Sequence, residues 1–119
     1  MQILTKENLD AAIKKCKEND RYKVLIVTKY VGDHHYILDY LSEAGIDVVR
    51  RFNNSFARFL NGSNINLISS SSNITCGARA NLVLYQEDIC NECEEARYVL
   101  AAMEVYNTSF RLFNNQEVQ

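Results

Sequence analysis

Two cysteines lie three residues apart in the sequence Cys90-Asn91-Glu92-Cys93. Two thiols at this spacing can bind one metal ion or exchange a disulfide. A tetrahedral zinc ion needs two further ligands, and the candidates are Cys16, Cys76, His34 and His35. The carboxylates beside the pair oppose thiolate formation, and the chain has no proline for the cis-proline loop of a thioredoxin-like fold. We therefore expect Cys90 and Cys93 to be free thiols, and a thiol or zinc protein is the second alternative.

His34 and His35 follow Gly32-Asp33 at the expected start of a helix, where outward-pointing amides favour anions. The sequence places no serine or cysteine nucleophile beside either histidine, and we expect both side chains to be exposed. A phosphate loop needs a Gly-Lys pair, and none of the four glycines precedes a lysine. A dinucleotide-binding fingerprint is also missing. The sequence thus predicts no catalytic residues and no cofactor.

Acidic side chains are concentrated in residues 87–119, which contain seven acidic residues and two arginines. We expect an acidic face that binds a basic protein partner, formed by Glu87, Asp88, Glu92, Glu94 and Glu95. Glu87 and Asp88 also follow an expected strand directly, at the sheet edge where α/β proteins place their ligands. Capping of the next helix by Asp88 is the structural interpretation of that pair.

Basic side chains are concentrated in the arginine segment, residues 48–86, which contains no acidic residue. Its four arginines are Arg50, Arg51, Arg58 and Arg79. Guanidinium groups bind phosphates through paired hydrogen bonds, and nearby phenylalanines can stack on bases or pack in the core. Nucleic-acid binding through this segment is the first alternative. The structural interpretation is that the arginine segment and the acidic face are paired with each other or solvated.

The elements that must position these residues alternate between helices and strands. Helices are expected over residues 5–19, 36–44 and 88–106, and strands over residues 23–28, 46–50, 56–60, 64–68, 82–85 and 110–113. The strand at residues 23–28 is a continuous β-branched run, the pattern of a strand buried on both faces, and Asn61-Gly62 is a hairpin turn. We predict a single three-layer α/β domain with a mainly parallel sheet plus a β-hairpin, and a polar tail at residues 114–119.

Composition sets limits on the class of protein. The 119 residues are 47% hydrophobic and 24% charged, with a formal charge of −2, which suits one globular domain and excludes a strongly basic nucleic-acid binder. Charged or amide side chains interrupt every apolar stretch, so no segment is expected to span a membrane. The first residues do not have the pattern of a secretory signal, and we expect a cytoplasmic protein.

Several short motifs follow one another between residues 23 and 100. They are the strand Lys23–Thr28, the helix ending at Gly45, the hairpin Asn61-Gly62-Ser63 with Ile65–Ser69, and Gly77-Ala78-Arg79-Ala80-Asn81 before Leu82–Asp88. This order resembles the RecA-like ATPase core, in particular that of phage large terminases and related helicase-type enzymes. The last motif resembles that family's Gly-x-Arg-Ala-Asp turn before the Walker B strand, which normally ends in Asp-Glu.

The sequence departs from that family at the catalytic positions. Gln86 stands where the magnesium-binding Asp is expected, Glu87 stands at the place of the catalytic Glu, and the phosphate loop is missing. Without that loop and that Asp, triphosphate and magnesium are not held in the usual way. We therefore expect no enzyme, but a non-catalytic interaction protein of phage origin that binds and modulates a protein or protein–nucleic-acid machine. One form is an inhibitor of a host defence nuclease, whose basic groove the acidic face would occupy.

Overall fold

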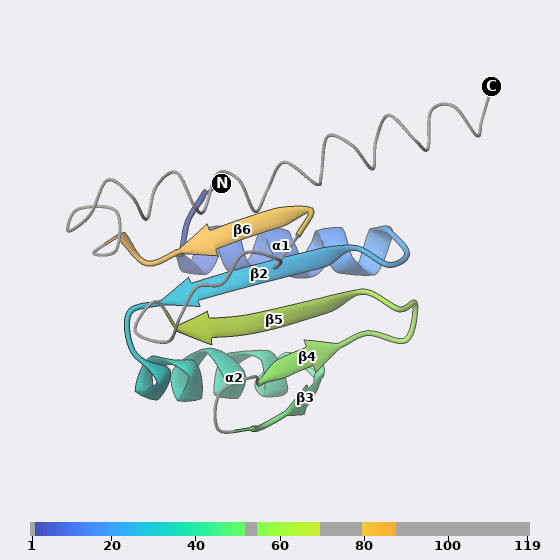
Figure 1. Ribbon diagram of the computed structural model, residues 1–119. Helices are drawn as coiled ribbons and strands as arrows, with labels where there is room; N and C mark the ends of the chain where they lie inside the picture. Colours follow the sequence, from blue (N-terminus) through green and yellow to red (C-terminus); the bar gives the residue numbers. More distant parts are fainter. Residues whose placement is uncertain (1, 52–54, 70–79, 88–119) are drawn as a thin grey trace.

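The computed structural model describes residues 2–51, 55–69 and 80–87 of the chain. Within these residues, one sheet has the strand order β1-β6-β2-β5-β4-β3 (Figure 1). The strands are β1 (Gln2–Ile3), β2 (Lys23–Thr28), β3 (Asp47–Val49), β4 (Phe56–Arg58), β5 (Asn64–Ser69) and β6 (Leu82–Tyr85). The helices are α1 (Lys6–Glu18), the short 3-10 helix η1 (Val31–Asp33) and α2 (His34–Glu43). The prediction of an α/β domain with a mainly parallel sheet and a hairpin is confirmed.

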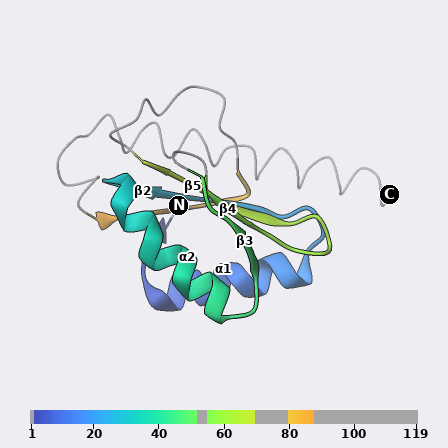
Figure 2. The same ribbon diagram turned by 90° about the horizontal axis from the view of Figure 1, so that it is seen from below.

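Helices α1 and α2 cover the same face of the sheet, as the view in Figure 2 shows. Their apolar side chains meet those of the strands in one core, where Leu9 and Leu41 pack with Ile26, Ile65 and Leu84. Each such side chain, once buried, stabilises the fold by roughly 1.5–3 kcal/mol. The core therefore fixes both helices against β2, β5 and β6.

Three sequence predictions lie outside the described residues. They are the helix at 88–106, which would supply the third layer, the strand at 110–113 and the polar tail at 114–119. Neither α1 nor α2, the α-helices of the described part, is long and apolar enough to cross a membrane.

Strand β2 lies between β5 and β6, and both neighbours run parallel to it. Residues Val24 to Thr28 are all buried, which confirms the strand predicted from the continuous apolar run. Val24 and Ile26 belong to the helix-side core, and strand alternation places Leu25 and Val27 on the opposite face. Because β2 has a neighbour on each side, its ends are the places where further contacts can tie it to the fold.

The predicted strands at residues 23–28 and 46–50 are both present as β2 and β3, but they are not neighbours in the sheet. Strand β3 runs in the same direction as β2, while β4 and β5 lie between them. The reason is the antiparallel β4–β5 hairpin, whose second strand returns to pair with β2 over its full length. At the other edge, β1 pairs with β6. Strand β1 was not predicted from the sequence.

Helix α2 ends in the glycine cap that the sequence predicted. Gly45 has a φ of 84°, in the left-handed region that glycine adopts without steric cost. Its N–H donates to the Ser42 carbonyl at 3.0 Å, and the Ile46 N–H donates to the Leu41 carbonyl at 3.1 Å. This is the Schellman arrangement, and the packing of Ile46 and Leu41 in the core completes it.

The β4–β5 turn is tied to the α1–β2 connection by the polar side chains of Ser63 and Asn61. Ser63 is 1% exposed, and its hydroxyl donates to the Asn19 carbonyl at 2.5 Å and accepts from the Tyr22 N–H at 2.9 Å. The Asn61 amide donates to the Cys16 carbonyl at 2.7 Å. These contacts hold the amino-terminal end of β2 against the hairpin.

Replacing Ser63 by alanine should lower the free energy of unfolding by about 1–3 kcal/mol, because it removes two hydrogen bonds of a buried hydroxyl, each worth roughly 0.5–1.5 kcal/mol. Chemical denaturation measures the loss. The matched control is Ser42→Ala on the exposed side of α2, which should change stability by less than about 0.5 kcal/mol. Equal stability of the Ser63→Ala variant and the parent would contradict the role given to this hydroxyl.

Candidate functional site

The candidate site lies at the carboxyl edge of the sheet, which we define by the ends of the parallel strands β2, β5 and β6 at Thr28, Ser69 and Tyr85. Strand β3 ends at the same edge, and α2 begins there (Figure 1). In α/β proteins this edge is where loops and helix starts gather ligand-binding groups. It therefore brings together residues from four separate parts of the chain.

Gln86 forms a clamp at this edge. Its side-chain oxygen accepts from the Lys29 N–H at 2.6 Å, and its side-chain nitrogen donates to the Asp33 carboxylate at 3.3 Å. Its own backbone N–H donates to the Val27 carbonyl at 3.0 Å. We call this set of contacts the Gln86 clamp. It joins the end of β6 to the end of β2 and to η1, and the second contact uses a nitrogen donor that an aspartate would lack.

Two hydroxyl groups continue these ties along the edge. Thr28 donates to the Tyr30 carbonyl at 3.0 Å, and Ser69 donates to the Lys29 carbonyl at 3.0 Å. Both side chains are buried. The connection that leaves β2 is therefore held by side chains from β5 and β6 as well as by its own.

The expectation that both histidines are exposed is wrong for His34, which is 4% exposed. Its Nε2 lies 3.1 Å from the Ile68 carbonyl, so this nitrogen carries the proton and donates. Burial lowers the pKa of His34 and outweighs the Ile68 hydrogen bond and the Asp33 charge, which raise it. His34 is thus a neutral hydrogen-bonding side chain that joins α2 to β5.

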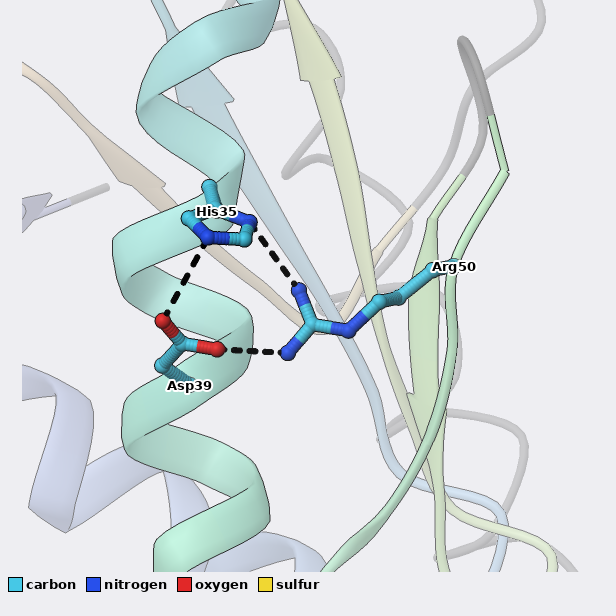
Figure 3. A network of polar contacts seen from close by, with 3 residues as sticks. All are labelled: His35, Asp39 and Arg50. Carbon is cyan, nitrogen blue, oxygen red and sulfur yellow. Dashed lines mark hydrogen bonds and ion pairs between the residues drawn. The ribbon is translucent and has the colours of Figure 1, made fainter.

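His35 is exposed, as predicted, and takes part in a network with Asp39 and Arg50 (Figure 3). One Arg50 nitrogen donates to Asp39 Oδ1 at 2.6 Å, and the other lies 3.3 Å from His35 Nδ1. Because a guanidinium group can only donate, His35 Nδ1 accepts and His35 Nε2 carries the proton. That nitrogen lies 3.7 Å from Asp39 Oδ2. The network joins α2 to the segment after β3.

The predicted phosphate-contacting arginines do not form one group. Arg50 and Arg51 both line a hollow at the carboxyl edge. Arg58 lies in β4 and pairs with Asp47 of β3 at 2.6 Å, and Arg79 lies outside the described residues. Phe59 packs against the core, whereas the Phe56 ring lies under the Arg51 guanidinium at 5.4 Å.

Most of the acidic face, Asp88, Glu92, Glu94 and Glu95, lies outside the described residues, and Glu87 is exposed just after the Gln86 clamp. Cys76, Cys90 and Cys93 also lie outside them. Cys16 lies on the buried face of α1, and burial raises the pKa of its thiol to about 12. A buried thiol that stays protonated is a poor metal ligand. In the parts of the chain that the structure describes, no cluster of three or more histidine, cysteine or acidic residues could hold a metal ion.

Comparison with known proteins found no matching protein-family model, curated protein or solved structure. The resemblance to the RecA-like core therefore stays a prediction, and the site must be interpreted from its own geometry.

Replacing His34 by glutamine should reduce the loss of stability in mild acid. Because the pKa of His34 is lowered on folding, the unfolded chain takes up a proton more readily, and stability falls as the pH drops below about 6.5. Chemical denaturation between about pH 5 and pH 7 measures this slope. Ser42→Ala, an exposed position of α2, is the control, since it keeps both histidines and should keep the parent's slope. An unchanged slope in His34→Gln would contradict the assignment.

Proposed function

We propose that this chain is a non-catalytic interaction protein, which uses an ATPase-like α/β scaffold to bind and modulate a protein or protein–nucleic-acid machine. The observation that carries this proposal is the Gln86 clamp. In the resembled enzymes this position supplies a carboxylate to magnesium. Here it supplies an amide whose oxygen and nitrogen are both engaged, with the Lys29 N–H and the Asp33 carboxylate. The clamp favours a structural role for the position over metal binding.

The acidic face supports a protein partner with a basic surface. Residues 87–119 have five more negative than positive charges, and the described part of this segment, Glu87, is exposed directly beside the carboxyl edge. Complementary charge steers association and selects the partner. In the specific form of the proposal, the chain is phage-encoded, acts in the host cytoplasm, and occupies the nucleic-acid groove of a host defence nuclease.

A charge-reversal experiment tests this proposal. The full chain is immobilised, partners are captured from an extract of the cell in which it is naturally made, and each is identified and purified. We expect the triple variant Glu92→Lys, Glu94→Lys, Glu95→Lys to bind the partner at least tenfold more weakly than the parent does. We also expect DNA to displace the partner from the parent chain.

The matched control reverses three exposed acids elsewhere: Glu18→Lys, Asp20→Lys, Glu43→Lys. It changes the net charge by the same amount and should keep the partner. Equal binding by the two variants, whether retained or lost, would contradict the acidic face as the binding surface.

Direct nucleic-acid binding is the second candidate function, and the placement of Arg50 and Arg51 at one hollow favours it. In the same capture experiment, this alternative predicts that nucleic acid is recovered in place of a protein. Its retention should weaken steeply with salt and disappear when Arg50, Arg51, Arg58 and Arg79 become alanine.

A further inference from the structure

The hollow at the carboxyl edge has room for one small polyatomic ion. Its volume is about 150 Å³, and it lies between the start of α2 and the segment after β3. A water molecule takes about 30 Å³ of liquid, so the hollow holds about five waters. Sites for drug-sized ligands and cofactors are larger, at about 300–1,000 Å³. The hollow therefore suits a single polyatomic ion or one charged group of a larger molecule.

Positive charge dominates the lining. Arg50 and Arg51 contribute two guanidinium groups, and His35 lies beside them in the lining. Asp39 offsets one of these charges through its contact with Arg50. Arg51 forms no ion pair within the described parts of the chain. The lining thus has an excess positive charge, and Val31 and Leu38 add apolar side chains to it.

Arg51 is held in place in a way that leaves its donors available. The Ser55 hydroxyl accepts from the Arg51 N–H at 3.0 Å and donates to the Arg51 carbonyl at 2.9 Å, so the backbone is fixed from both sides. The guanidinium lies over the Phe56 ring, with 5.4 Å between the guanidinium carbon and the ring centroid. Contact through its face leaves the N–H groups free to donate in the plane of the guanidinium.

Arg50 is positioned in a similar way. Two of its N–H groups are engaged, with Asp39 at 2.6 Å and with His35 at 3.3 Å, out of the five donors that a guanidinium carries. The two contacts come from successive turns of α2 and fix the direction of the side chain (Figure 3). Both arginines are therefore ordered before any ligand arrives, which lowers the entropic cost of binding.

From these observations we infer that the hollow is a binding site for a phosphate group, contacted by Arg50 and Arg51. Paired guanidinium N–H groups match the oxygens of a tetrahedral dianion in geometry and charge. The phosphate can belong to a free phosphorylated small molecule or to the 5′ end of an oligonucleotide. The inference shares Arg50 and Arg51 with the nucleic-acid candidate, but not Gln86 and the acidic face, which carry the main proposal. Binding of inorganic phosphate therefore tests the site separately from that proposal.

Titration of the full chain with inorganic phosphate, against sodium chloride at matched ionic strength, tests the site. Backbone NMR should give saturable shifts at His35, Arg50 and Arg51, with a dissociation constant at or below the millimolar range. Arg51→Gln should weaken binding at least tenfold. The matched control is Arg58→Gln, which removes an exposed, ion-paired arginine that does not line the hollow and should leave the affinity unchanged.

Absence of saturable shifts in the parent protein would overturn the site, and this result does not depend on any variant folding. Equal binding by Arg51→Gln and the parent, or equal losses in Arg51→Gln and Arg58→Gln, would also overturn it. A short oligonucleotide with and without a 5′ phosphate then separates the two sources. If only the oligonucleotide with the 5′ phosphate binds more tightly than inorganic phosphate, the site is assigned to a nucleic-acid end. If it binds no more tightly, the site is assigned to a small phosphorylated molecule.

Discussion

The fold depends on holding β2, a fully paired and buried strand, at both of its ends. At the amino-terminal end, the Ser63 hydroxyl accepts from the Tyr22 N–H and the Asn81 side chain accepts from the Lys23 N–H at 2.8 Å. At the carboxyl end, Gln86 accepts from the Lys29 N–H. Backbone N–H groups that leave a ladder must find other partners, and here side chains from β6 and the β4–β5 turn supply them. Gln86 therefore both orders the sheet and shapes its carboxyl edge.

This arrangement divides the carboxyl edge into two parts with different capacities. Between β2 and β6 the polar groups bind one another, and both polar atoms of the Gln86 amide are engaged. Beside α2, by contrast, Arg50 and Arg51 are fixed by neighbours that use only some of their donors. The unused donors of this edge thus lie beside α2, whereas the polar groups between β2 and β6 hold the strands together.

The sequence predicted the strongly patterned parts of the fold and missed contacts that depend on the assembled sheet. Periodicity located α1, α2, β2 and β6, and the turn chemistry of Gly45 and Asn61-Gly62 located the α2 cap and the hairpin. Two-residue β1 carries too little pattern to be recognised. The hydrogen bond from His34 to Ile68 spans 34 positions of the sequence, and the one from Gln86 to Asp33 spans 53 positions. No local sequence pattern encodes such contacts. Asp39 was detectable in principle, because it lies four residues after His35 on the same helix face.

The central claim is that position 86 is built for an amide and not for a metal-binding carboxylate. The most direct test is the free energy of unfolding of the Gln86→Glu variant. Glutamate keeps the size of the side chain and its acceptor oxygen, but it puts a carboxylate beside Asp33 in place of the amide N–H donor. We predict a loss of about 1–3 kcal/mol that magnesium does not restore, with exposed Gln2→Glu as a neutral control. Parent-like stability of Gln86→Glu, or stabilisation of that variant by magnesium, would contradict the account.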